Sequence, residues 1–225
     1  MLKDLMVRTR SCRRFHEDAP VARQTRLDLV DLARLAPSGA DRQALKYCLS
    51  NDPGTNALVF PHLTWTGHGA CWSGPAAGER PAAYILILCD HGLSPNCGCD
   101  HGFAAQAILL GATESGLGCC VIGSIHRGPL REALGLAERF EILVAIALGR
   151  PRESFVVDTA APGGELRHWV DELGVHHVPK RALADIIVDI DITIRDQHLL
   201  QNGESALTRV SRHRRRQAAA GLPPQ

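Results

Sequence analysis

The sequence predicts an α+β fold, and three observations carry this prediction. Helical and strand-like segments are mixed along the 225 residues without a regular strand–helix–strand repeat. No G-x-G-x-x-G motif follows a predicted strand, which disfavours a Rossmann dinucleotide fold. The length suits one sizeable core, because single cores stop growing only at roughly 250–300 residues.

Four apolar segments predict strands. Ala83–Cys89 is a continuous β-prone run, which is typical of a strand covered on both faces. Shorter strands are expected at Leu45–Ser50, Cys119–Ile122 and Ile142–Leu148.

Helices are predicted between these strands. Thr25–Ala36 carries apolar residues at helical spacing and ends at Pro37-Ser38-Gly39. Asp100–Leu117 is apolar nearly all round, so we expect a buried central helix, and Pro129–Leu134 predicts a shorter one.

One long segment, Asn51–Gly78, is rich in Gly, Pro, Asn and Ser and predicts a loop. We expect Trp65 and Trp72 to anchor it. Long ordered loops in compact domains are often lids over binding sites.

Composition excludes several classes of protein. Hydrophobic residues make up 45% of the chain and charged residues 22%, as in globular proteins. The net charge of +1 gives no overall field that favours nucleic acid or an anionic membrane. The apolar runs are far shorter than the roughly 20 residues of a membrane span. With no secretory signal recognised at the N-terminus, we expect a cytoplasmic protein without membrane or nucleic-acid partners.

The chain changes character after Ile187. We therefore predict a domain over residues 1–187 and a flexible tail over residues 188–225. Five arginines lie within Arg209–Arg216 and indicate a solvated tail, with contact to nucleic acid or an anionic surface as the alternative.

Eight cysteines occur, and without a secretory signal we expect them to be reduced. Cys97-Gly-Cys99 lacks a second pair at zinc-site spacing, so no metal site is predicted, although the nearby His91 and His101 leave one as the alternative. The Cys119-Cys120 pair is expected to form inert core thiols. Neighbouring side chains face different ways, so a metal shared by His176 and His177 is not expected.

A basic cluster near the N-terminus is the first candidate for ligand binding. Residues 8–14 hold four arginines and two hydroxyl side chains. Arginine offers paired donors to phosphate oxygens, and serine adds a directional hydroxyl, so the cluster suits a phosphate. The alternative is a solvated basic arm.

Three glycine-containing segments are further candidates. Pro37–Gln43 follows a helix, and its small residues would let backbone amides approach a flat ligand. Gly116–Ser124 joins a helix end to a buried strand, and Gly149-Arg150-Pro151 places an arginine at the end of the last core strand. Each could instead be an ordinary turn or surface charge. If the patches converge, they suit a phosphorylated, flat cofactor with a polar edge.

Six motifs in order resemble the FMN-dependent nitroreductase family. They are RSxRxF from Arg10, APSGAxRQ from Ala36, ERPAAYIxIxxD from Glu79, DxGxAAQxxLLxAxExGLGxCxIGSI from Asp100, EILxxIALGxP from Glu141 and HHVPKR from His176. The resemblance covers about residues 1–187.

The resemblance implies an intertwined homodimer in which helices flank a central, mixed, mainly antiparallel sheet. Two FMN sites would lie at the subunit interface. Arg10, Ser11 and Arg13 would hold the phosphate and ribityl chain, helped by Arg150 after Gly149. The partner subunit would line the flavin ring. The residues implied for the ring are Pro37, Ser38 and Gly39 of the partner, Asp41 and Gln43 near the polar edge, and Ile122, Gly123 and Ser124 on the other face.

The sequence departs from the family pattern at the polar edge. Where relatives often have Asn before x-Gln-Pro, this chain has Asp41 and Ala44. An ionised carboxylate only accepts hydrogen bonds. Near the ring it would disfavour the reduced anionic flavin, so Asp41 points away, is protonated, or lowers the reduction potential.

The implied activity is that of an NAD(P)H-dependent oxidoreductase. NADH or NADPH would deliver a hydride to flavin N5 and leave, and an electron-poor nitroaromatic or quinone would then be reduced. No general acid or base is nominated, because the flavin carries the redox step. The alternatives are a specialised reaction on the same scaffold, such as dehalogenation or flavin fragmentation, and a non-catalytic flavin-binding redox sensor.

Overall fold

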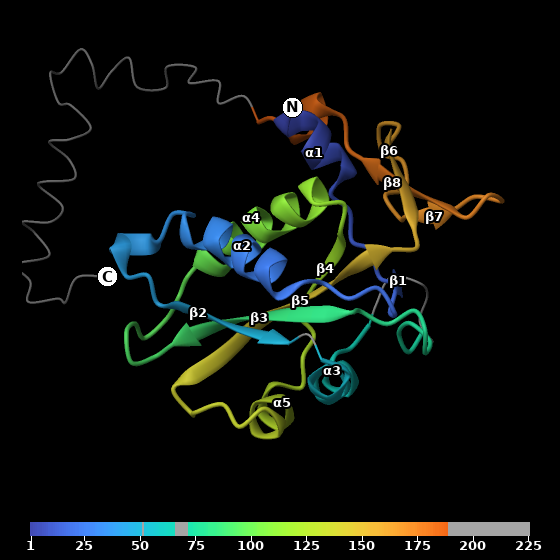
Figure 1. Ribbon diagram of the computed structural model, residues 1–225. Helices are drawn as coiled ribbons and strands as arrows, with labels where there is room; N and C mark the ends of the chain where they lie inside the picture. The colour runs from blue at the N-terminus through green and yellow to red at the C-terminus, as the bar shows by residue number, and fades with distance from the viewer. Residues whose placement is uncertain (51, 66–71, 189–225) are drawn as a thin grey trace, which may run out of the picture. The chain divides into compact units, whose positions relative to one another are not determined.

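The computed structural model describes residues 1–50, 52–65 and 72–188 (Figure 1). The chain divides into two compact units, Met1–Arg181 and Ala182–Gln225. The described part of the second unit holds one 3₁₀ turn, η3 (Leu183–Ile186). The arginines at 209–216 and nearly all of the predicted tail lie outside the described residues, so the boundary after residue 187 stays a prediction.

A five-stranded sheet forms the centre of the first unit. Its strands follow the order β1-β5-β3-β2, and β4 also pairs with β5. All the strand pairs found in this sheet are antiparallel. The strands are β1 (Phe15–His16), β2 (Leu45–Ser50), β3 (Ala83–Asp90), β4 (Gly118–Ile122) and β5 (Phe140–Pro151). The predicted strands are therefore confirmed, β5 being longer than expected.

The parallel pairing lies in a second, smaller sheet. There β6 (Ser154–Thr159) runs parallel to β8 (Val175–Lys180), and β7 (Trp169–Val170) pairs with β8 antiparallel. The α+β fold class is confirmed. In the central sheet the strand pairs are antiparallel, and the parallel contact found there is the isolated bridge between Ser11 and Cys119 of β4.

Helices cover both faces of the central sheet (Figure 1). Every residue of β3 is buried, because alternate side chains enter two different cores. On one face lie α2 (Arg23–Arg34) and α4 (Asp100–Glu114), and on the other lie α3 (Pro53–Val59) and α5 (Arg127–Ala133). The remaining helical elements are α1 (Leu2–Arg8), η1 (Gly39–Asp41) and η2 (Phe60–His62).

Two sequence predictions about helices were wrong. The segment predicted as a long loop contains α3 and η2, because Asp52 caps α3 by accepting a hydrogen bond from Thr55 N at 2.8 Å and Pro53 starts the helix. The helix α4 is not buried all round, since the Phe103 side chain is 51% exposed. Trp65 is buried and packs edge-on against Trp72, as expected of an anchor.

The cysteines also differ from expectation. Cys89 at the end of β3 and Cys97 in the following loop form a disulfide, with Cα atoms 5.9 Å apart. The chain reverses after β3, and this turn brings the two residues within bridging distance. Cys119 and Cys120 are buried free thiols, and burial raises the pKa of Cys119 to about 12, as expected of an inert core thiol.

Candidate functional site

The predicted phosphate-binding segment lies beside the central sheet where β4 begins and β5 ends. Ser11 forms an isolated bridge with Cys119, and Cys12 N donates to the carbonyl of Cys119 at 2.9 Å. Further along the chain, His16 of β1 pairs with Arg150 of β5. The structure therefore brings Arg10, Ser11 and Arg13 to the same end of the sheet as Gly149 and Arg150.

The guanidinium of Arg10 is only partly satisfied. Its Nη2 donates to the carbonyl of Met6, but its Nε is buried and has no partner. Burial also lowers the pKa of Arg10 below its usual value. A buried cationic donor without an acceptor is costly, so this position suits an anion such as a phosphate.

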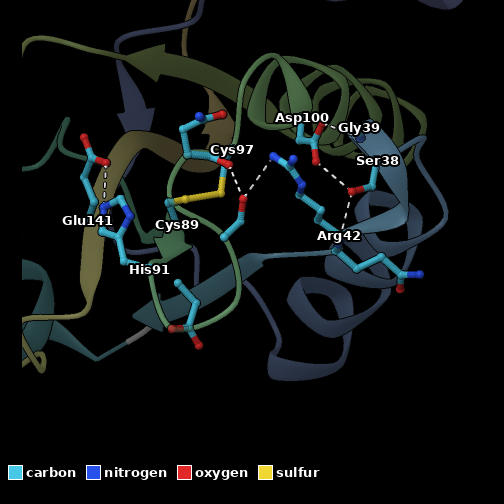
Figure 2. Close-up of a disulfide and its surroundings, with 12 residues drawn as sticks. Ser38, Gly39, Arg42, Cys89, His91, Cys97, Asp100 and Glu141 are labelled. Carbon is cyan, nitrogen blue, oxygen red and sulfur yellow. Dashed lines mark hydrogen bonds and ion pairs between the residues drawn. A yellow bond between two sulfur atoms is a disulfide. The ribbon is translucent and has the colours of Figure 1, made fainter. Parts of the chain in front are cut away.

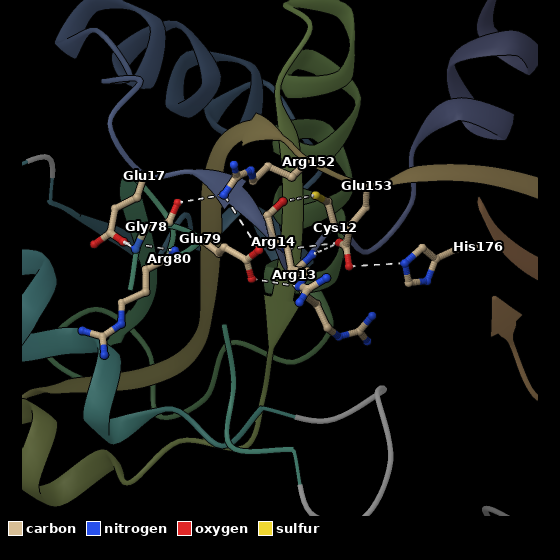
Figure 3. Close-up of polar contacts among 10 residues, drawn as sticks. All are labelled: Cys12, Arg13, Arg14, Glu17, Gly78, Glu79, Arg80, Arg152, Glu153 and His176. Atoms are coloured by element: carbon tan, nitrogen blue, oxygen red, sulfur yellow. Dashed lines mark hydrogen bonds and ion pairs between the residues drawn. The ribbon is translucent and has the colours of Figure 1, made fainter. Parts of the chain in front are cut away.

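Glu153 fixes the backbone of the same segment (Figure 3). One carboxylate oxygen accepts hydrogen bonds from Arg13 N at 2.5 Å and Arg14 N at 3.1 Å. The Glu153 side chain is only 3% exposed, and its other oxygen lies 3.5 Å from His176 Nε2. The sequence prediction missed Glu153, although a single acid among the arginines after β5 was a usable signal.

The opposite end of β4 carries Ile122, Gly123 and Ser124. Arg127 Nη2 donates to the carbonyl of Gly123 at 3.1 Å, and Thr64 N donates to the carbonyl of Ser124 at 2.9 Å. A Cβ added at Gly123 would meet nothing within 4 Å, so the surface there is open. The backbone at this end is thus held by carbonyl contacts while one side stays free for a flat ligand.

The two ends of β4 define an elongated surface. Ser11 pairs with Cys119, and Gly123 lies four residues further along the chain, or about 13 Å at the usual rise of a strand. A ligand with a phosphate at one end and a ring at the other fits this arrangement better than a compact ligand does.

The third predicted patch is a strained loop held by Asp100 (Figure 2). The Asp100 carboxylate accepts hydrogen bonds from Ser38 Oγ at 2.7 Å and Gly39 N at 2.9 Å. Ser38 Oγ in turn accepts from Gln43 N at 2.9 Å.

The strain in this loop lies in its backbone. Ala40, Asp41 and Gln43 adopt φ angles of 52°, 53° and 47°, which non-glycine residues rarely do. Such strain gathers at functional sites and persists only where the surroundings enforce it. Asp100 supplies this support, and although its motif was recognised, the sequence prediction did not nominate it.

Within a single chain, this loop and the phosphate-binding segment lie at opposite ends of α4. Asp100 is the first residue of α4, whereas Thr113 near its other end accepts a hydrogen bond from Thr9 Oγ1 at 2.9 Å. From Asp100 to Thr113 the helix spans about 20 Å. The residues from Pro37 to Gln43 therefore do not converge with Arg10 within one chain.

The remaining candidates carry structural roles. His176 is buried against Glu153, while His177 contacts Asp158 and Asp171, so the two rings face different surroundings as predicted. Within the described ranges, no three His, Cys, Asp or Glu side chains gather as a metal ion would require. Among the same residues, no helix combines the length and apolar character needed to cross a membrane.

The chain superposes on a protein from Desulfovibrio desulfuricans assigned as a nitroreductase and solved in complex with FMN, with a TM-score of 0.60 and 24% identity. That match covers 84% of this chain and 96% of the other. A protein from Parabacteroides distasonis assigned as an NADH dehydrogenase/NAD(P)H nitroreductase matches with a TM-score of 0.57 and 22% identity, over 68% of this chain and 89% of the other.

A third similar structure is the NADPH:FMN oxidoreductase of Vibrio harveyi in complex with NAD⁺. Its TM-score is 0.54 at 22% identity, and the match covers 67% of this chain and 69% of the other. Together these structures establish a nitroreductase-like fold. A model of the nitroreductase family also matches residues 99–150, which run from the start of α4 into the end of β5. The resemblance to the nitroreductase family drawn from the six motifs is confirmed.

Proposed function

We propose that the protein is an FMN-dependent oxidoreductase that uses NADH or NADPH to reduce electron-poor small molecules such as nitroaromatics and quinones. The single observation that carries the proposal is the buried, unpartnered Nε of Arg10 at one end of β4, with an open glycine-containing backbone at the other. This arrangement fits FMN, which has a phosphate at one end and a flat ring at the other. The cytoplasmic location stays a prediction.

The phosphate end is assigned to Arg10, Ser11, Arg13 and Arg150. Arginine binds phosphate oxygens with paired, charge-assisted donors, and Arg10 has one donor without an acceptor. Glu153 holds the backbone amides of Arg13 and Arg14, so it positions the segment without contacting the phosphate.

The ring end is assigned to Ile122, Gly123 and Ser124 of the same chain. Arg127 and Thr64 hold the carbonyls of Gly123 and Ser124, so the flavin would meet a preorganised backbone rather than a flexible loop. When bound, FMN supplies the hydride chemistry, and the protein supplies binding, orientation and exclusion of water.

We also propose that a homodimer completes the site. The loop from Pro37 to Gln43 lies about 20 Å along α4 from the Arg10 end of its own chain. A second copy related by a two-fold axis can supply this loop to the first, and it receives the same loop in return. Two equivalent sites per dimer follow from this symmetry.

Anaerobic reduction tests the proposed activity. The purified protein loaded with FMN is mixed with NADH or NADPH in the absence of oxygen, and the flavin absorbance is followed. Bleaching with at least one nucleotide, reversed by a quinone or nitroaromatic, is the expected result. Failure of both nucleotides to bleach bound FMN would refute the oxidoreductase assignment, and failure to bind FMN would refute the site itself.

A further inference from the structure

The two cysteines of the Cys89–Cys97 disulfide differ in exposure. Cys89 is fully buried in β3, whereas Cys97 is 8% exposed. Cys97 lines a cavity of about 490 Å³, which also contacts the exposed thiol residue Cys99 and residues of the loop that starts at Pro37. Because Cys97 lines this cavity and Cys89 does not, we expect a thiolate that enters it to attack the sulfur of Cys97.

The disulfide packs directly against the strained loop. Ala44, at the end of this loop, forms a small buried cluster with Cys89 and Cys97. The carbonyl of Ala44 accepts a hydrogen bond from Asp90 N at 2.9 Å, and Asp90 follows Cys89.

A second connection between the disulfide and the loop runs through the segment between Cys89 and Cys97, which are eight positions apart in the sequence. Ser94 lies within it and accepts a hydrogen bond from Arg42 Nη1 at 3.5 Å. Ser94 also donates to the carbonyl of Asn96 at 2.6 Å, so the loop contact is tied to the backbone beside Cys97.

The third connection passes through Asp100. The carbonyl of Cys97 accepts a hydrogen bond from Asp100 N at 3.0 Å. The Asp100 carboxylate holds Ser38 and Gly39, which directly precede the residues with positive φ angles. Movement of Cys97 away from Cys89 would therefore shift the residue that supports the strained backbone.

We propose that Cys89–Cys97 is a thiol–disulfide exchange site for small monothiols, and that its reduction releases the loop of residues 37–44. A monothiol thiolate attacks the Cys97 sulfur, the Cys89–Cys97 bond breaks, and Cys89 leaves as a thiolate that takes up a proton. A second monothiol then attacks the mixed disulfide. The balance is two protein thiols formed and one oxidised monothiol disulfide released, with two electrons transferred to the protein.

The exchange and the loop release need no flavin. Their consequence for the flavin rests on the function proposed above, in which this loop lines the ring in the partner subunit. Reduction would loosen the ring contacts and leave the phosphate end unchanged, because α4 separates the two. Both parts of the proposal are tested on the full chain without FMN, so their failure is distinct from failure of the oxidoreductase assignment.

Mass-spectrometric mapping tests the exchange. The full chain is incubated with glutathione under native conditions, the exchange is stopped with acid, and the chain is then unfolded and alkylated so that buried thiols are labelled too. In the wild type we expect Cys89 and Cys97 to become alkylated together, and in Cys89→Ser we expect oxidised glutathione to attach at Cys97. A disulfide that stays intact until the chain is unfolded would overturn the proposal, and so would modification confined to Cys99.

Hydrogen exchange tests the loop release. The amides of Gly39 and Gln43 are both hydrogen-bonded in the disulfide form, and we expect the peptide that contains them to exchange about tenfold faster after reduction. Cys89→Ser should match the reduced wild type, whereas the control Cys99→Ser keeps the disulfide and should match the oxidised wild type. If Cys89→Ser does not fold, the glutathione-reduced wild type gives the same measurement. Unchanged protection in the reduced chain would overturn the coupling.

Discussion

Replacement of Glu153 should weaken FMN binding by disturbing the contacts to the phosphate, while the contacts to the flavin ring are kept. The Glu153 carboxylate does not belong to the proposed contact set for FMN. It acts on the segment that does, because it accepts hydrogen bonds from the backbone amides of Arg13 and Arg14. Without this acceptor, the two amides lose their hydrogen-bond partner. The backbone that positions the guanidinium groups of Arg10 and Arg13 is then no longer held in place.

The structure sets the size of this effect. Both hydrogen bonds go to a charged acceptor that is 3% exposed, and each such bond contributes about 1.5–3 kcal/mol. Glu153→Ala should therefore lower the free energy of unfolding by several kcal/mol. Both amides donate to the same oxygen, Oε2, so Glu153→Gln can keep both hydrogen bonds to a neutral acceptor and should cost less. A loss of about 1.4 kcal/mol in phosphate positioning corresponds to a tenfold weaker FMN affinity.

Titration with FMN and with riboflavin separates positioning from general damage. Riboflavin carries the same ring without the phosphate. We expect the Kd for FMN to rise about tenfold in Glu153→Gln while the Kd for riboflavin changes less than about twofold. Equal weakening of both ligands would show a merely structural role for Glu153, and unchanged FMN affinity would refute the reasoning.

Three further predictions concern the loop held by Asp100, the central sheet and the smaller sheet. Asp100→Asn should raise the hydrogen-exchange rate of the residue 38–44 segment, because an amide is a weaker acceptor than a carboxylate; unchanged exchange rates would count against Asp100 as its support. Gly118→Ala should lower the unfolding free energy by about 1–3 kcal/mol, since its Cβ would lie 3.0 Å from neighbouring atoms, while the control Gly128→Ala meets open space and should not destabilise. Denaturant titration checks both glycine variants, and equal stability would contradict the packing argument. His177→Gln should lower the Tm most below pH of about 6.5, because the hydrogen bond to Asp158 raises the pKa of His177 in the folded chain. This Tm difference should shrink as the pH rises through the raised pKa, and a difference independent of pH would show that the imidazolium is not involved.

Much of the fold could be predicted because periodicity and apolar runs report local structure directly. The run in β3 is buried on both faces, and such a strand has few alternatives. The helix α3 was missed because its sequence is short and rich in loop-forming residues. Its N-cap Asp52 and the following proline decide the outcome.

The site was predictable in its residue types but not in its supports. Arg10 and the glycines of β4 belong to recognisable motifs. Glu153 and Asp100 act through contacts with backbone amides far away in the sequence, and spacing carries no information about such contacts. The Cys89–Cys97 pair was missed for a related reason, because cysteine pairing depends on where the chain turns.

The central claim is that each flavin site combines the Arg10 end of one chain with the residue 37–43 loop of another. Hybrid dimers test it most directly. One variant, Arg10→Glu with Arg13→Glu, removes the phosphate end, and the other, Gly39→Trp, blocks the loop. The two chains are co-expressed with different tags, and doubly tagged dimers are purified and titrated with FMN.

We expect that neither variant alone binds FMN, whereas the hybrid binds about one FMN per dimer, because one of its two sites combines two intact halves. A hybrid that binds no FMN would contradict the shared site, and so would a Gly39→Trp homodimer that binds FMN normally.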